Sequence, residues 1–183
     1  LATLIIVSCR SSGENLITAC VEGRAQDVQR ILKRDPSLAQ YRDKMWNGYP
    51  LSYAVEYNHH EIVKNLIENG SPVDYVDSIV GTPLKYAAFY SDLEMVEILV
   101  DAGASINSTN SEGKLAAPAL YNAVGSAKLK TAAYLIEKGA DVNDRSHGTT
   151  ILHFLLKSEK PNSELLMLIL ENGGDINILD ADS

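Results

Sequence analysis

The sequence predicts an all-α fold built from a repeated helix–turn–helix unit, and its spacing carries the prediction. A Gly-x-x-(Val/Ile)-(Asp/Asn) pattern occurs four times, beginning at Gly70, Gly103, Gly139 and Gly173. The steps between these glycines are 33, 36 and 34 residues (103 − 70, 139 − 103 and 173 − 139). Each interval has room for two short helices and a turn. A nearly fixed period of this size is typical of a solenoid.

The stretch from Gly81 to Asn107 carries the clearest copy of the unit, and its first half predicts a helix with a defined start. Thr82 suits the N-cap position because its hydroxyl can accept a hydrogen bond from an otherwise unpaired backbone N–H. Pro83 suits the first helical position, where a missing N–H costs nothing. The apolar face of this helix is formed by Leu84, Ala87 and Ala88.

The second half of the same stretch predicts an amphipathic helix. Its apolar side is formed by Val96, Leu99 and Val100, and its polar side by Glu94, Glu97 and Asp101. Gly103 follows and supplies the left-handed residue that ends the helix. One such unit alone could not bury its apolar face, so the pattern predicts that neighbouring units stack on it.

The Gly81-Thr82-Pro83-Leu84 opening, the two helices and the four copies in register resemble the ankyrin-repeat family from about Glu14 to Asp180. The resemblance implies an all-α solenoid of stacked helix–turn–helix units joined by β-turn fingers. It also implies that the chain works by binding other proteins.

We expect a leader at residues 1–13 and an ankyrin-repeat domain at residues 14–183. The expected repeats cover about 14–46, 47–79, 80–112, 113–147 and 148–183. The first repeat lacks the Thr-Pro-Leu opening and is polar, as expected of a terminal repeat. The last helix, from Glu164 to Leu170, is apolar almost all round. It predicts either that more chain follows Ser183, which we favour, or that this end meets a partner or another copy.

The leader has two interpretations. Residues 1–7 are mostly apolar but too few to span a bilayer. In the first interpretation they are the remnant of a signal peptide. Ile6-Val7-Ser8-Cys9 resembles the lipobox of bacterial lipoproteins, which implies lipidation of Cys9, a polar tether at residues 10–13 and an exported or membrane-anchored protein. In the second, the segment covers the open end of the stack in a cytoplasmic protein. The sequence leaves both open.

Composition argues against several classes of function. The net charge of −8 and the pI of about 4.9 argue against nucleic-acid binding, which needs a basic stripe to displace counterions. The two cysteines, Cys9 and Cys20, form neither a disulfide framework nor a zinc motif. Cys20 falls at a position where ankyrin helices carry a small buried residue, so we expect it in the core.

No catalytic residue, metal ligand, cofactor or small-molecule substrate is predicted. His60-Glu61 is followed by Lys64 where a zinc protease needs a second histidine. His59 and His60 occupy a turn where ankyrins often carry Gly-His. His153 fills the family's Thr-Pro-Leu-His position, where Ser52, Lys85 and Tyr121 stand in other repeats. The acidic residues lack the spacing of a calcium loop.

The predicted binding site is an aromatic concave face of the second and third repeats. In ankyrin proteins the fingers and the first helices line this face, a mapping that the resemblance implies. Aromatic side chains with a polar tip are favoured anchors of protein interfaces. The predicted partner-binding residues are Met45, Trp46, Tyr53, Tyr57, Ile79, Tyr86, Phe89 and Tyr90. The alternative is that several of these rings pack between repeats.

Three functions therefore remain under consideration. The leading one is a non-enzymatic module that binds a protein partner on this face. The second is a structural or tethering domain of a larger chain. The third is an exported lipoprotein that protects or inhibits another protein, tethered to a membrane only through the lipid on Cys9.

Overall fold

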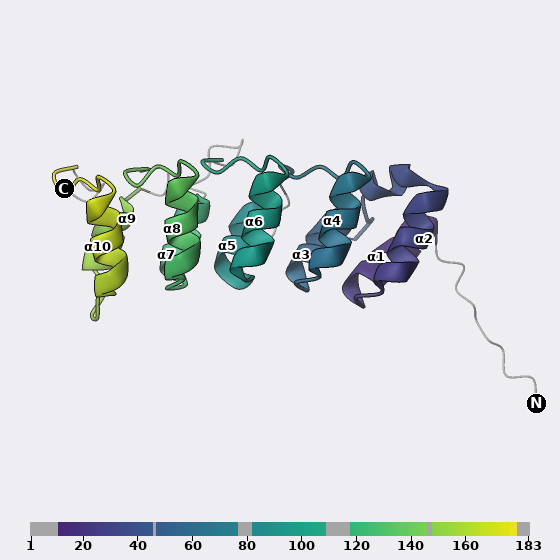
Figure 1. The fold of residues 1–183 in the computed structure, drawn as a ribbon, viewed down its shortest axis with the longest axis horizontal. Helices are drawn as coiled ribbons and strands as arrows, with labels where there is room; N and C mark the ends of the chain where they lie inside the picture. Colours follow the sequence, from purple (N-terminus) through teal and green to yellow (C-terminus); the bar gives the residue numbers. More distant parts are fainter. Residues whose placement is uncertain (1–10, 46, 77–81, 109–117, 146–147, 179–183) are drawn as a thin grey trace, which may run out of the picture. The chain divides into compact units, whose positions relative to one another are not determined.

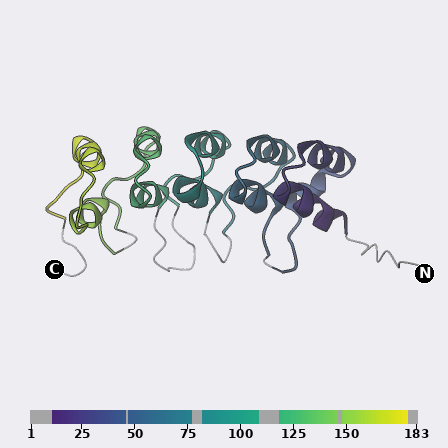
Figure 2. The ribbon, with the colours of Figure 1, turned by 90° about the horizontal axis from the view of Figure 1, so that it is seen from below.

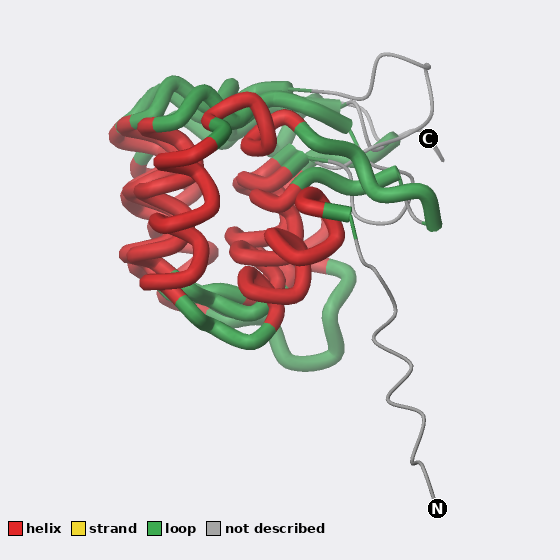
Figure 3. Tube along the Cα trace, turned by 90° about the vertical axis from the view of Figure 1, so that its right-hand side faces the viewer, coloured by secondary structure: helices red, strands yellow, loops and turns green. Residues whose placement is uncertain are grey.

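The computed structural model describes residues 11–45, 47–76, 82–108, 118–145 and 148–178. The described residues form α-helices, one 3-10 helix and loops, with no strand among them (Figure 3). None of the described helices is long and apolar enough to cross a membrane. The chain divides into two compact units, residues 1–71 (unit 1) and 72–183 (unit 2). Each unit is described by itself.

Unit 1 holds two helix pairs and a 3-10 helix: α1 (Ser12–Val21), α2 (Ala25–Arg34), η1 (Pro36–Gln40), α3 (Pro50–Glu56) and α4 (His60–Glu68). Helix α1 begins inside the segment that the sequence assigns to the leader. A capping box explains this start, because Glu14 N donates to Ser11 Oγ at 3.2 Å and Ser11 N donates to Glu14 Oε2 at 2.9 Å. Gly13 is buried in the first turn, so Ser12 and Gly13 belong to α1, with Ser11 as its N-cap, rather than to a tether. Cys9 lies outside the described residues.

The core of unit 1 lies between its helices. Helix α1 packs on α2 and α3, and α4 packs on α2 and α3. Cys20 is fully buried in this core, as expected, and burial raises the pKa of its thiol to about 12. The other large side chains of α1 to α4 with almost no exposure are Leu16, Leu32, Leu51, Ile62 and Leu66.

Unit 2 holds three helix pairs: α5 (Pro83–Tyr90) with α6 (Leu93–Asp101), α7 (Ala119–Gly125) with α8 (Leu129–Glu137), and α9 (Ile151–Leu156) with α10 (Ser163–Glu171). Figure 1 shows α6, α8 and α10 side by side in chain order, and Figure 2 shows the same pairs end-on in two rows. Helix α7 packs on α5, and α8 lies against both α6 and α10. The predicted stacking of successive units is thus present within unit 2.

The start of α5 agrees with its sequence. Thr82 is the N-cap, its Oγ1 accepts from Lys85 N, and Pro83 is the first helical residue. Leu84 is 1% exposed. In α6, Leu99 is fully buried, whereas Val100 is only partly so. Met95, which the sequence pattern leaves out, is also fully buried.

A ladder of hydrogen bonds joins the turns of unit 2. Gly103, Gly139 and Gly173 have φ values of 89°, 94° and 87°, the left-handed conformation that glycine adopts without strain. Asn107 Nδ2 donates to the Gly139 carbonyl at 2.9 Å, and Asn107 Oδ1 accepts from Asp141 N at 3.0 Å. Each asparagine of this ladder thus ties its own turn to the turn of the next helix pair.

Candidate functional site

The finger that precedes α3 in unit 1 is organised by Asp43. Asp43 Oδ1 accepts from Met45 N at 2.8 Å, and Oδ2 accepts from Gly48 N at 2.7 Å and from the Tyr53 hydroxyl at 2.9 Å. Asp43 N also donates to the Gly48 carbonyl at 3.0 Å. One carboxylate therefore closes the turn and ties it to helix α3. Asp43 was not predicted from the sequence, although an aspartate ahead of a Gly is a common turn signal.

This finger exposes one of the predicted binding residues, Met45, and is held in place by another, Tyr53. Met45 is 79% exposed, so its side chain lies on the surface and not in the core. Tyr53 is half-buried, and its bond to Asp43 gives it a part in holding the finger. Tyr57 follows α3, is 49% exposed, and its ring stacks with that of His59 at 6.4 Å between centroids. Trp46 lies outside the described residues.

In unit 2 the aromatic residues of α5 form a cluster at the C-terminal end of that helix. The ring centroids of Tyr86 and Tyr90 are 4.8 Å apart, and those of Phe89 and Tyr90 are 4.5 Å apart. Tyr90 is 65% exposed and Phe89 40% exposed, while Tyr86 is half-buried. Helical spacing explains the cluster, because Tyr86 and Tyr90 are four residues apart on one face. The structure brings these three predicted residues together; Ile79 lies outside the described residues.

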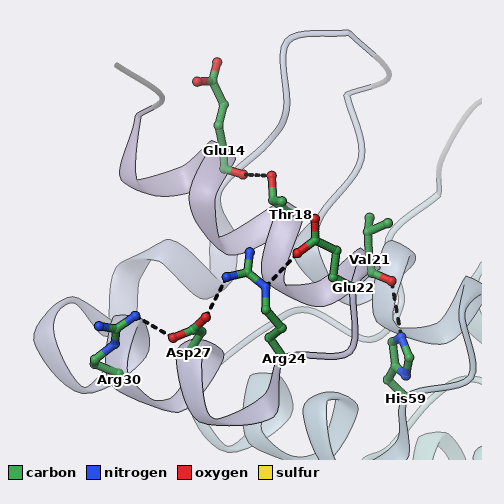
Figure 4. A network of polar contacts seen from close by, with 8 residues as sticks. All are labelled: Glu14, Thr18, Val21, Glu22, Arg24, Asp27, Arg30 and His59. Carbon is green, nitrogen blue, oxygen red and sulfur yellow. Dashed lines mark hydrogen bonds and ion pairs between the residues drawn. The ribbon is translucent and has the colours of Figure 1, made fainter. Parts of the chain in front are cut away.

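A network of charged side chains lies around Arg24 in unit 1 (Figure 4). Arg24 Nε lies 2.7 Å from Glu22 Oε2. Asp27 forms ion pairs with Arg24, at 2.6 Å, and with Arg30, at 2.5 Å. An open cavity at this network has a volume of about 360 Å³ and is lined by Ser12, Asn15, Ala19, Arg24, Asp27, Arg30, Ile31, Arg34, Asp35 and Leu38. The carboxylates of Glu22 and Asp27 pair with two of the three arginines at this cavity, Arg24 and Arg30.

His59 connects two elements of unit 1. His59 Nε2 lies 3.3 Å from the Val21 carbonyl, so the imidazole links the loop before α4 to the end of α1 (Figure 4). Among the described residues, no group of three His, Cys, Asp or Glu side chains is placed to hold a metal ion.

The family assignment follows from comparison with known proteins. A family described as "Ankyrin repeats (3 copies)" matches residues 15–110, just over half of the chain. The chain belongs to the ankyrin-repeat family. An ankyrin-repeat domain is a non-catalytic interaction fold, and ankyrin repeats generally bind protein partners.

The ankyrin chain is also similar to parts of longer proteins. A "Probable E3 ubiquitin-protein ligase XBOS32" of Oryza sativa subsp. japonica is 38% identical over 66 residues, which cover 36% of this chain and 13% of that protein. The E3 ubiquitin-protein ligase XBAT32 of Arabidopsis thaliana is 36% identical with the same coverage. A "Putative ankyrin repeat protein" of Rickettsia felis is 39% identical over 72 residues, or 36% of this chain and 32% of that one.

One residue at a recurring ankyrin position has an unusual environment. Lys85, which stands where the family carries histidine, is only 4% exposed. Its Nζ has no hydrogen-bond partner in the described part of the chain. Burial lowers the pKa of this amine below its ordinary value of 10.5, and the negative charge of Asp144 partly opposes that shift. The folded ankyrin unit therefore disfavours the protonated amine relative to the unfolded chain.

Replacing Lys85 with methionine should stabilise the protein at neutral pH, by about 1 kcal/mol, because a buried unpaired polar group is removed. The effect should depend on pH. Since the folded-state pKa is lowered, the cost of the lysine is largest below that pKa and fades as pH rises towards 10.5. The melting temperatures of Lys85→Met and wild type should therefore converge at high pH. The matched control is exposed Lys130→Met, for which no such convergence is expected. A constant difference across pH would contradict the assignment.

A second aromatic pair in unit 2 was not predicted as a site. Tyr121 of α7 and Phe154 of α9 have ring centroids 4.9 Å apart and are both half-buried. Tyr121 also stands at the ankyrin histidine position. The pair joins successive first helices, so it contributes to packing between repeats.

Proposed function

We propose that this ankyrin chain is a non-enzymatic interaction module that binds a protein partner through exposed aromatic residues. The observation that carries the proposal is the cluster of Tyr86, Phe89 and Tyr90 on α5. Phe89 and Tyr90 keep much of their surface in water although both are large and aromatic. Exposed residues of this kind are favoured as anchors in protein interfaces.

The geometry of the cluster also supports a role in binding. Each ring contacts another ring, at 4.8 Å and 4.5 Å between centroids, so the side chains are partly ordered before a partner arrives. Side chains that are already ordered lose less conformational entropy on binding. The Tyr86 and Tyr90 rings carry hydroxyl groups, which can donate and accept hydrogen bonds at the rim of an interface.

Unit 1 supplies further candidates of the same kind. Met45 projects from a finger held by Asp43, and Tyr57 is exposed after α3. Methionine adapts its shape to a partner surface, and a turn closed by side-chain hydrogen bonds presents it in one position. We include Met45, Tyr53 and Tyr57 in the proposed partner-binding set, with Trp46 and Ile79 as sequence predictions.

The double variant Phe89→Ala/Tyr90→Ala tests the proposal. Interface anchors each contribute about 2 kcal/mol or more, so losing both should weaken partner binding by roughly a thousandfold. Affinity capture with the wild-type chain as bait, followed by quantitative mass spectrometry, identifies the proteins whose enrichment disappears in the variant. Far-UV circular dichroism should be unchanged, since both side chains are exposed.

Tyr134→Ala on α8 is the matched control, because it removes an aromatic ring from a second helix and leaves α5 intact. A protein that binds the α5 cluster should be captured by wild type and by Tyr134→Ala, and it should be lost with the double variant. If the double variant captures the same proteins at the same level as wild type, the α5 cluster is not the binding site.

A second candidate function is that of a recognition domain within a larger protein. The observation that favours it is that this chain matches only 13% of the length of the plant ubiquitin ligases. In such a protein the ankyrin stack would bind a target while another domain carries the activity. The full-length reading frame decides between an isolated module and a domain of a larger chain.

The third candidate, an exported lipoprotein that protects or inhibits another protein, depends on Cys9. A diacyl modification of this cysteine would be detected directly by mass spectrometry of the protein isolated from its source. An unmodified Cys9 within an intact N-terminal segment would remove the lipoprotein interpretation and leave the binding module unaffected.

A further inference from the structure

The last helix pair of unit 2 exposes apolar residues at positions that are buried or half-buried in the earlier pairs. The sixth residue after the N-cap of each first helix is Ala88 in α5, Val124 in α7 and Leu156 in α9. Ala88 is 0% and Val124 3% exposed, whereas Leu156 is 43% exposed. The same position thus changes from core to surface at the end of unit 2.

The second helices and their turns show the same change. Three residues after the left-handed glycines stand Ile106, Val142 and Ile176. Val142 is 7% exposed and Ile106 is half-buried, but Ile176 is 57% exposed. Three residues before Gly173, Leu170 is 47% exposed, whereas Val100 and Ile136 at the same position are half-buried. We call Leu156, Leu170 and Ile176 the end face.

The hydrogen-bond ladder is also incomplete at this end. Asn143 Nδ2 donates to the Gly173 carbonyl at 2.9 Å, and Asn143 Oδ1 accepts from Asp175 N at 2.8 Å. Asn177 occupies the next position of the ladder. Its Nδ2 turns back to Asp175 Oδ1 in its own turn, at 2.9 Å, and within the described residues its Oδ1 accepts no hydrogen bond. The Asn177 carboxamide therefore lacks the two backbone groups that Asn107 and Asn143 bind.

We propose that the end face is a stacking surface for one further ankyrin-type repeat of the same polypeptide. The apolar residues of that repeat would cover Leu156, Leu170 and Ile176. The carbonyl of its left-handed glycine and the N–H two residues later would bind Asn177. Apolar burial and the hydrogen-bond ladder both support this occupant. In the earlier part of unit 2, the next repeat both covers the apolar residues of the repeat before it and supplies the backbone groups that bind its asparagine.

A second copy of the chain fits the end face less well. A copy stacking head to tail would present α1 and α2, and α2 ends in Asp35-Pro36-Ser37 without a left-handed glycine. Ser37 N already donates to Asp35 Oδ1 at 3.1 Å, so it is not available to Asn177. A copy related by two-fold symmetry would set one Asn177 against the other, with no glycine carbonyl opposite.

The test extends the chain by one repeat and measures hydrogen exchange. In one variant, residues 178–183 are replaced by a copy of residues 144–177. In a second variant they are replaced by a copy of residues 108–143, the segment that follows Asn107 in the chain. We expect exchange of the α9 and α10 amides to slow by about tenfold or more in at least one extension. Leu170→Glu should abolish this gain in the extended chain while leaving exchange in the 183-residue chain unchanged.

Two results would overturn the proposal. One is unchanged exchange of α9 and α10 in both extensions, which would mean that the end face does not accept a repeat. The other is dimerisation of the 183-residue chain, detected by light scattering and reversed by Leu170→Glu, which would assign the end face to a second copy. Binding to the α5 cluster is measured separately, through Phe89 and Tyr90, and neither result depends on it.

Discussion

Leu99→Ala is expected to lower the free energy of unfolding by about 3 kcal/mol, the largest effect on stability among the proposed substitutions. Leu99 lies in α6 with no exposed surface, in the core of unit 2. Shortening it removes apolar contacts and leaves a cavity that the neighbouring helices fill only in part. Urea titration followed by far-UV circular dichroism measures the loss as a lower midpoint.

Leu170→Ala provides the matched control for this prediction. Leu170 stands on α10, also a second helix of a pair, but it is 47% exposed. The same chemical change there should cost less than about 1 kcal/mol, as is usual for surface positions. Equal losses for Leu99→Ala and Leu170→Ala would contradict the burial difference on which the prediction depends.

Gly13→Ala is expected to destabilise unit 1 by about 2 kcal/mol although it adds a single methyl group. A Cβ at position 13 would lie 2.4 Å from Tyr41 Cδ2 and 2.5 Å from Tyr41 Cγ. The Tyr41 hydroxyl is buried, so the ring has little room to move away. The methyl group would force α1 and the tyrosine apart.

Gly125→Ala is the control, because nothing lies within 4 Å of a Cβ at that position in α7. Alanine favours a helix more than glycine does, so this change should be neutral or stabilising by about 0.5–1 kcal/mol. Thermal unfolding of the two variants measures the contrast. A stabilising Gly13→Ala would show that residues 11–13 do not form part of the folded unit.

The repeat, the start of α5 and several core positions could be predicted from the sequence because they depend on neighbouring residues. Thr82 and Pro83 set a helix start through groups within three residues of each other. Gly103, Gly139 and Gly173 end second helices because only glycine adopts positive φ freely. Helical periodicity identified Leu84 and Leu99 as core residues, because it also determines which side of a helix is buried within one repeat.

The candidate site could be predicted in part. The mapping implied by the ankyrin resemblance placed Tyr86, Phe89 and Tyr90 on the solvent side of a first helix, but it could not tell exposed rings from packed ones. Tyr53 and Tyr86 look alike in the sequence, yet the Tyr53 hydroxyl is bound to Asp43 while Tyr86 contacts Tyr90. The difference arises from a turn ten residues away in the chain, which no local pattern contains.

By itself, then, the sequence determined an ankyrin-type solenoid, its period and the caps of its helices, since these follow from interactions within a few residues. Only the tertiary structure decided that Gly13 packs against Tyr41, that Lys85 is buried and that Leu170 is exposed. These properties depend on residues brought together from distant parts of the chain. In a repeat protein every copy has nearly the same local pattern. Which residues of a copy stay exposed and available to a partner therefore depends on what stacks against that copy.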